Sequence, residues 1–255
     1  MCLDFGDGRH PLKLSPNMSS TVNDDIVSKL QKYSACDISD ALLKLKVSSG
    51  GVLVDLLPMT TSARLGDSAS PTSIAPVIAP VSTVLFAPKD PSLQPSTPRN
   101  IPGDAHWVDL THSGTFVVLQ QPKGQTNAVC GGIMALRMKV LGAKGIVVAG
   151  RVRDVMELES TGLPVWARGT STVGSGASSV PWATQIDIEV DGTLVRPGDL
   201  AFCDPTHGVV VIPQGKVLEV LELLPRLTSA DDKAKQDVAK GSSVREAFQR
   251  HRGNL

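Results

Sequence analysis

The feature that most constrains this chain is the segment 124–154, where a helical pattern runs directly into an unbroken apolar run. Gly131 and Gly132 precede apolar residues at helical spacing, and Gly142 follows where that helix is expected to end. The predicted apolar face comprises Ile133, Met134, Leu136, Val140 and Leu141. Residues 146–149 (IVVA) then predict a strand buried on both faces. This order predicts an α/β fold.

Polar residues follow the predicted strand at once, in the sequence GRVRD at positions 150–154. The carboxyl ends of buried strands in open α/β sheets commonly form ligand sites. The start of a helix carries unpaired N–H groups and a partial positive charge. We therefore expect Arg153, Asp154 and the helix start at Gly131 to face one crevice, suited to a small anion beside a metal ion.

The sequence GGIMALRMKVLGAKGIVVAGRVRDVMEL at positions 131–158 resembles the RraA-like family. That family includes metal-dependent 4-hydroxy-4-methyl-2-oxoglutarate aldolases, which also decarboxylate oxaloacetate. Further blocks similar to the family are SACDISDAL (34–42), GLPVWARG (162–169), VRPGD (195–199) and GVVVIP (208–213). The resemblance implies one mixed α/β domain with a layered β/β/α swivelling-domain fold, assembled as a homotrimer or hexamer.

Three parts are expected along the chain: a flexible tail at 1–22, an RraA-like catalytic domain at 23–228 and a C-terminal helical extension at 229–255. The first residues are rich in Pro, Gly and Ser and show no periodicity. An amphipathic helix at 216–224 is expected to end at Pro225, and Ser243 with Glu246 has capping-box spacing before a last helix. Residues 58–76 read as a surface loop, inserted relative to the family pattern.

Local signals predict further elements. Asp37 or Ser39 is expected to cap a short helix. Strands are predicted at residues 53–57, 77–86 and 114–119, and Asp191-Gly192 predicts a hairpin turn.

Composition favours a cytoplasmic protein with no nucleic-acid or membrane partner. Lys and Arg number 25, as do Asp and Glu, so no net field attracts polyanions. The four cysteines are scattered, as in a reducing compartment, and the first ten residues lack the order of a signal peptide. Aromatic residues make up only 4%, so no base-stacking platform is visible.

Arg153 and Asp154 have two interpretations. A surface ion pair that caps the next helix is the structural one. The family resemblance implies instead that Arg153 contacts a 2-oxo acid and that Asp154 holds a divalent cation, so that both are catalytic. One carboxylate with several waters suits Mg²⁺ or Mn²⁺.

The same resemblance places a pyruvate carboxylate against the backbone of Gly131, Gly132, Ile133 and Met134. One departure concerns Gly132, because aldolases of the family often carry an Asp there that supports a metal-bound water. Retro-aldol cleavage needs a base for the substrate hydroxyl, whereas decarboxylation of a β-keto acid does not. We therefore expect decarboxylation to be retained better than aldol cleavage.

Other polar residues are weaker candidates. The histidines are expected to be surface or capping residues, and two aspartates to serve turns: His106, His112, His207, Asp199 and Asp204. Arg168 is a candidate for the cleft, and Glu157 for orienting metal-bound water.

The leading hypothesis is a metal-dependent carbon–carbon lyase, of the class II pyruvate aldolase and oxaloacetate decarboxylase type, that forms pyruvate through a metal-stabilised enolate. The alternative is a non-enzymatic protein-binding regulator, because bacterial members of the resembled family inhibit an endoribonuclease. A methyltransferase is disfavoured, since no Gly-rich cofactor loop follows a first strand.

Overall fold

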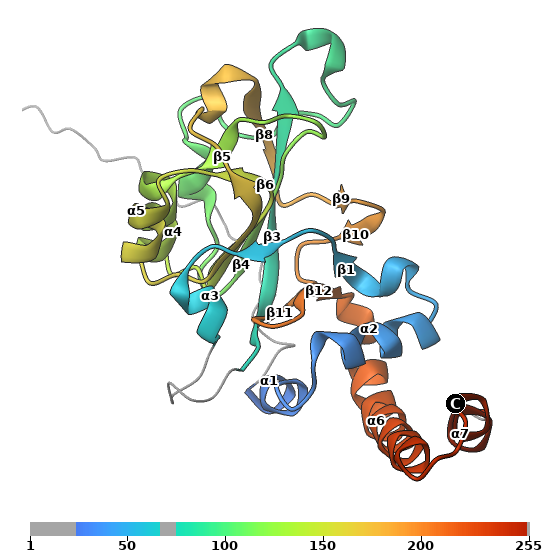
Figure 1. Ribbon diagram of the computed structural model, residues 1–255. Coiled ribbons are helices and arrows are strands. Elements are labelled where there is room, and N and C mark those ends of the chain that lie inside the picture. Colours follow the sequence, from blue (N-terminus) through green and yellow to red (C-terminus); the bar gives the residue numbers. More distant parts are fainter. Residues whose placement is uncertain (1–23, 67–74, 254–255) are drawn as a thin grey trace, which may run out of the picture.

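The buried strand expected at residues 146–149 lies inside a mixed sheet, with a parallel strand on each side (Figure 1). The computed structural model describes residues 24–66 and 75–253, and within them this sheet has ten strands. They are β1 (Val52–Leu53), β2 (Leu57–Pro58), β3 (Val77–Pro88), β4 (Phe116–Gln120), β5 (Ala128–Cys130), β6 (Gly145–Val152), β7 (Val165–Thr170), β8 (Ser179–Thr184), β11 (Leu200–Asp204) and β12 (Gly208–Ile212). The expected tail at 1–22 and residues 67–74 of the expected loop lie outside the described residues.

The order of the sheet is β1-β12-β11-β3-β4-β6-β7-β2, with β5 added to β6 and β8 added to β3. Strands β3, β4, β6 and β7 are parallel, whereas β11, β12 and β8 join antiparallel. The long strand β3 serves both regions, because residues 77–80 pair with β11 and residues 81–85 pair with β4. The mixed α/β class is therefore confirmed.

The described residues form seven helices, most of which gather in two places (Figure 1). They are α1 (Asp24–Leu30), α2 (Ala35–Lys44), α3 (Thr61–Leu65), α4 (Gly132–Val140), α5 (Val155–Ser160), α6 (Val217–Ala239) and α7 (Val244–Arg252). Short 3-10 turns are η1 (Ser48–Gly51), η2 (Pro91–Leu93), η3 (Trp107–Leu110), η4 (Ser175–Ala177) and η5 (Gln214–Lys216). Helices α4 and α5 lie together beside β5 and β6, and α2, α6 and α7 lie beyond β11 and β12.

Strand β6 is buried on both faces, as its apolar run predicts. Ile146 and Val148 pack on the side of α4 and α5, with Met138 and Leu158. Val147 packs on the other side, towards Trp166 and the hairpin of β9 (Ile188–Val190) and β10 (Thr193–Val195). That hairpin turns at Asp191 and Gly192, whose φ angles of 49° and 84° confirm the predicted turn.

The predicted apolar face of α4 is mostly wrong, although Met134 does pack against the core. The helix buries Gly132, Ala135 and Met138, whereas Ile133, Leu136 and Val140 are 74%, 56% and 66% exposed. The small residues let the helix approach its neighbours closely, which side-chain hydrophobicity alone does not indicate. The predicted end is confirmed, because Gly142 has φ 85° and the N–H of Ala143 reaches the carbonyl of Met138 at 2.9 Å.

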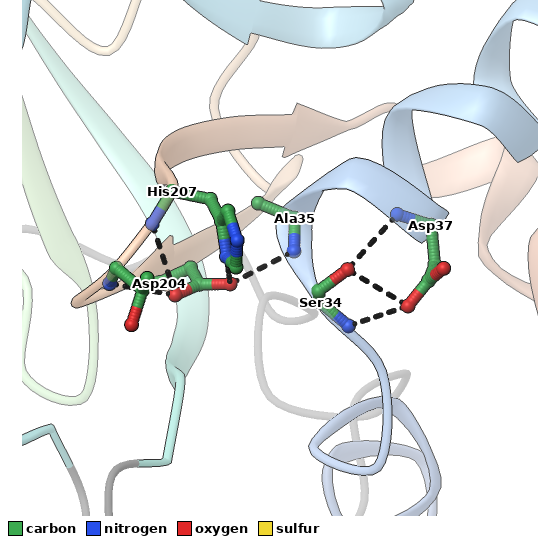
Figure 2. A network of polar contacts seen from close by, with 6 residues as sticks. Ser34, Ala35, Asp37, Asp204 and His207 are labelled. Carbon is green, nitrogen blue, oxygen red and sulfur yellow. Dashed lines mark hydrogen bonds and ion pairs between the residues drawn. The ribbon is translucent and has the colours of Figure 1, made fainter.

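The cap predicted for the helix after residue 33 is also wrong. Ser34 begins α2 instead, and Asp37 completes a capping box from its third position, with its Oδ2 accepting the Ser34 N–H at 2.9 Å (Figure 2). The same figure shows Asp204, at the end of β11, accepting the N–H of Ala35 at 2.9 Å and bonding His207 Nδ1 at 3.0 Å. Asp204 therefore joins the turn between β11 and β12 to the start of α2.

Three local predictions need correction. Helix α6 continues through Pro225 to Ala239, because Leu224 and Leu227 extend its buried face and offset the lost hydrogen bond. The strand expected at 53–57 is two short strands, β1 and β2, and the expected loop at 58–76 contains α3. The capping box of Ser243 and Glu246 is confirmed.

Candidate active site

A cavity of about 320 Å³ lies where the start of α4, the end of β6 and the turn η4 meet. Its lining residues are His106, Trp107, Ala128, Val129, Cys130, Gly131, Ile133, Met134, Arg153, Asp154, Gly174, Ser175 and Gly176. Strand β5 runs beside β6, and each leads into one part of this wall. The topology thus brings together the two segments, 131–134 and 153–154, that the sequence marks as a candidate site.

Gly131 is the contact between those two segments. It is the N-cap of α4 in an extended conformation and has no side chain to occupy the free N–H groups of the first turn. A Cβ placed on Gly131 would lie 2.7 Å from Asp154 Oδ2 and 3.0 Å from Arg153 Cγ. A side chain at position 131 would therefore displace the side chains of Asp154 and Arg153, and the helix start and the Arg-Asp pair face the same space.

Asp154 has an unusual backbone. Its φ of 56° and ψ of 47° are left-handed, a conformation that costs a non-glycine residue about 1–2 kcal/mol. It begins α5, yet its side chain makes no capping hydrogen bond, contrary to the structural interpretation. The carboxylate instead accepts from Arg153 Nε at 2.9 Å through Oδ2. Among the described residues the same left-handed conformation occurs at Lys46, Ser49, Asp55, Gln185 and Asp191, so the backbone of Asp154 does not by itself mark a function.

Arg153 extends from Asp154 towards the turn at Gly174. Its backbone N–H donates to the carbonyl of Cys130 at 3.0 Å, and its Nη1 lies 2.8 Å from where a Cβ on Gly174 would be. The side chains of Arg153 and Asp154 are 45% and 35% exposed. An ion pair with that exposure contributes about 1 kcal/mol or less to stability, so the fold gives little reason for it.

Gly132 lies beneath the side chain of Glu157. A Cβ on Gly132 would be 1.9 Å from Glu157 Oε2 and 2.4 Å from Glu157 Cβ. The carboxylate of Glu157 thus occupies the space that a side chain at position 132 would take. A carboxylate is present at the start of α4 although residue 132 itself has none.

The side chains of Cys130 and Asp154 are the candidate metal ligands on this side of the cavity. Burial raises the pKa of the Cys130 thiol to about 12, with the nearby Asp154 charge adding to the effect. The Cys130 thiol therefore stays protonated when no metal is bound. Within the described ranges no group of three His, Cys, Asp or Glu side chains could hold a metal. The donor set is one hard carboxylate with room for water, which fits Mg²⁺ or Mn²⁺ rather than Zn²⁺.

The other predicted residues lie in different surroundings. Ile133 and Met134 line the cavity, with Met134 also packed against the core. Arg168 is outside it and forms an ion pair with Asp191 beside a separate cavity of about 430 Å³. The turn roles of Asp199 and Asp204 are confirmed by their backbone hydrogen bonds.

His106 is the residue that the sequence undervalued. It caps η3 as expected, with Nδ1 accepting the N–H of Val108 at 3.3 Å. It also lines the cavity with Arg153 and Asp154, together with Trp107. No spacing signal connects residues 106 and 153, because their proximity depends on how a loop packs against α4.

The sequence of this chain matches one protein family. The RraA-like family, described as Aldolase/RraA, matches residues 35–211. Protein DlpA of Legionella pneumophila is 25% identical over 228 residues, which are 88% of this chain and 33% of that protein. A Halalkalibacterium halodurans protein named "Putative 4-hydroxy-4-methyl-2-oxoglutarate aldolase" is 32% identical over 123 residues, which are 48% of this chain and 57% of that protein. The chain therefore spans less than two thirds of the length of these relatives.

Among solved structures, Streptomyces coelicolor RraAS2, described as an unusual member of the RNase ES inhibitor RraA protein family, superposes with a TM-score of 0.62. It is 24% identical, and the match covers 87% of this chain and 98% of RraAS2, which supports the shared fold. Separately, among residues 24–66 and 75–253 no helix has the length and apolar character needed to cross a membrane.

Proposed function

This chain belongs to the RraA-like (Aldolase/RraA) family, and from that premise we propose that it is a divalent-metal-dependent carbon–carbon lyase. Its substrate is a 2-oxo acid such as oxaloacetate or 4-hydroxy-4-methyl-2-oxoglutarate, and its product is pyruvate. The catalytic domain on this proposal is 23–228, with 229–255 as an extension, in a cytoplasmic protein. The name of the Halalkalibacterium halodurans relative supports this class of reaction.

The observation that carries the proposal is the contact of Gly131 with the Arg153-Asp154 pair in one cavity. The side chain of Asp154 does not cap α5, and its ion pair with Arg153 is too exposed to matter much for stability. A site that binds a cation beside an anion accounts for all three features.

Each residue then has a role. The N–H groups at the start of α4 hold the substrate's C1 carboxylate, because they lack partners and carry partial positive charge. Arg153 donates hydrogen bonds to the C2 oxygen as it becomes an enolate oxygen. Asp154 would hold Mg²⁺ or Mn²⁺, which supplies a Lewis acid for the 2-oxo group.

Oxaloacetate decarboxylation needs no base. The C3–C4 bond breaks, CO₂ leaves and the electron pair forms the enolate, which takes a proton from water at C3 to give pyruvate. Aldol cleavage also requires removal of the C4 hydroxyl proton. Gly132 supplies no base, and Glu157 is the carboxylate that lies over that position. We infer that decarboxylation is faster than aldol cleavage and that Glu157 supports whatever aldol activity remains.

A homotrimer or hexamer is also part of the proposal. The exposed side of α4 and α5 carries Ile133, Leu136, Val140 and Met156, the last 82% exposed. An apolar surface of this kind beside the cavity is typical of a protein contact. The same surface is available to the alternative function, a protein-binding regulator, which the description of RraAS2 brings into consideration.

The test is pyruvate release from oxaloacetate with Mg²⁺, with and without a chelator. We expect activity that the chelator removes and that falls at least about a hundredfold in Asp154→Ala. Asp187→Ala is the matched control, since it removes an Arg-Asp pair of similar exposure outside the cavity. No metal-dependent pyruvate release, or full activity in Asp154→Ala, would refute the lyase. A stoichiometric protein partner of the inactive protein would favour the regulator.

A further inference from the structure

Gln121 joins the two strands that lead into the candidate active site. Strand β7 pairs with one edge of β6, so β4 and β5 share the other edge. Along that edge β4 pairs with residues 145–149, and β5 pairs with residues 151–152. The chain leaves the sheet between β4 and β5, at residues 121–127. The side chain of Gln121 reaches back to β6 at this interruption.

The side-chain amide of Gln121 bonds to both sides of the interruption. Its Oε1 accepts the backbone N–H of Arg151 at 2.9 Å, and its Nε2 donates to the backbone carbonyl of Asn127 at 2.6 Å. A side-chain amide offers an acceptor and a donor, as a peptide unit does. It therefore takes the place of a peptide unit where the β4–β6 ladder stops and the β5–β6 ladder begins.

The surroundings of Gln121 hold its amide in this position. Gln121 is 5% exposed, and a Cβ on Gly150 would lie 2.2 Å from Gln121 Oε1 and 2.6 Å from Gln121 Cβ. The side chain thus packs directly on the backbone of β6. Asn127 is also buried, and its Nδ2 donates to Ser179 Oγ at 2.9 Å. Breaking buried hydrogen bonds of this kind is costly, because the polar groups left behind have no water to bond.

Each partner of the amide leads into one half of the candidate site. Asn127 precedes β5, which is followed by the helix start at Gly131. Arg151 lies in β6, which is followed by Arg153 and Asp154. A ligand that binds the helix start and the Arg-Asp pair together requires a fixed distance between them. A misplacement of about 1 Å is enough to lower catalysis strongly.

Strand β5 alone gives the helix start little support. It has 3 residues, and its pairing with β6 is shifted between Ala128 and Cys130. At the end of β5 the carbonyl of Cys130 accepts the N–H of Arg153 at 3.0 Å, and the amide of Gln121 holds the residue before its start. We propose that Gln121 is a positioning residue, which sets the start of α4 against the Arg153-Asp154 pair. Its effect on ligand binding rests on the proposed function, whereas its hold on the two strands does not.

Ligand binding tests the positioning role without turnover. Gln121→Met keeps the length of the side chain and removes both hydrogen bonds. Mn²⁺ alone needs only the carboxylate of Asp154, so its affinity should stay within about twofold of the wild-type value. Pyruvate at saturating Mn²⁺ needs both halves of the site, so its affinity should fall about tenfold or more. Electron paramagnetic resonance of free Mn²⁺ measures the first affinity, and calorimetry measures the second.

Thr83→Val is the matched control for loss of two buried hydrogen bonds. Thr83 is buried outside the cavity, and its Oγ1 donates to the carbonyl of Ile186 at 2.6 Å and accepts the N–H of Ile186 at 3.0 Å. This variant should leave both affinities unchanged. Gln121→Glu keeps the acceptor, so its pyruvate affinity should lie between those of the wild type and Gln121→Met. It replaces Gln121→Met in the binding measurements if that variant does not fold.

Hydrogen exchange tests the hold on the strands without any ligand. The amide of Arg151 should exchange about tenfold faster or more in Gln121→Met and close to the wild-type rate in Gln121→Glu, which still accepts its hydrogen bond. An unchanged rate in Gln121→Met would overturn the inference.

The binding results have their own contrary outcomes. Equal weakening of Mn²⁺ and pyruvate in Gln121→Met, unchanged pyruvate binding, or the same split in Thr83→Val would overturn the positioning role. If the wild-type protein binds no pyruvate with Mn²⁺, the proposed function fails. The exchange rate of the Arg151 amide then still decides whether Gln121 holds the two strands together.

Discussion

Replacing Gly132 with alanine tests the placement of Glu157 over the start of α4. The new Cβ would lie 1.9 Å from Glu157 Oε2 and 2.4 Å from Glu157 Cβ. The carboxylate can rotate away, but the Cβ of Glu157 moves only if α5 moves. Overpacking of this kind costs about 1–3 kcal/mol. Alanine regains at most about 1 kcal/mol of helix propensity, because Gly132 is the first residue of α4.

We therefore expect Gly132→Ala to lower the free energy of unfolding by about 1–2 kcal/mol. Glu157→Ala alone should change it by about 0.5 kcal/mol or less, because Glu157 is exposed. The double variant should recover roughly half of the loss, since the oxygens are gone and the Cβ contact remains. This amounts to a coupling energy of about 0.5–1 kcal/mol.

Urea unfolding of the four proteins in this cycle measures the coupling, provided that the slope m is the same in each. Gly215→Ala is the control, because a Cβ there meets nothing within 4 Å. Additive effects, within about 0.3 kcal/mol, would show that Glu157 does not occupy the space above Gly132. That result would also remove Glu157 as a stand-in for a carboxylate at position 132.

Three further substitutions have defined outcomes. Burial alone would raise the pKa of Asp204, but hydrogen bonds from Ala35, Thr206 and His207 outweigh it and lower the pKa below 3.8. Its carboxylate therefore stabilises the fold at neutral pH, and this stabilisation is lost as the pH falls through the lowered pKa. In urea unfolding, Asp204→Asn should lower the free energy of unfolding by about 2 kcal/mol at pH 7. That free energy should also fall less steeply with decreasing pH than it does in the wild-type protein. Pro225→Ala should raise the unfolding free energy by about 1–3 kcal/mol, measured in the same way, because an exposed proline in α6 gives way to a hydrogen-bonded residue. Gly131→Ala should reduce pyruvate release about tenfold or more, because its Cβ displaces Asp154 and Arg153.

Each of these three predictions would be contradicted by a specific result. An unchanged acid dependence in Asp204→Asn would mean that the Asp204 network does not hold α2. A destabilised Pro225→Ala would show that the proline ring makes contacts worth more than the missing hydrogen bond. Full activity in Gly131→Ala would separate the start of α4 from the chemistry.

Much of the fold was predictable where the signal is local. The apolar run at 146–149 predicted a strand buried on both faces, and Asp191-Gly192 predicted the hairpin turn between β9 and β10. The face of α4 was not predictable, because Gly132 and Ala135 allow close packing while the larger apolar residues point outwards. Likewise, Pro225 predicts a helix end because proline lacks a backbone N–H. Helix α6 continues through it because tertiary packing outweighs this local preference.

The candidate site shows the same division. Residues 131–134 and 153–154 were expected together because a helix and the following strand connect them, and the structure brings them together. His106 and the turn at 174–176 reach the same cavity from loops distant in sequence. Their arrival depends on loop packing, for which no periodicity or motif in the sequence carries a signal.

The most direct measurement is a crystal structure of the protein with Mn²⁺ and pyruvate, in which anomalous scattering locates the metal. The account predicts Mn²⁺ on the carboxylate of Asp154, with the pyruvate carboxylate at the N–H groups that open α4 and Arg153 against the oxo group. A cation bound elsewhere, or an Arg153 turned into solvent beside a site without pyruvate, would contradict it.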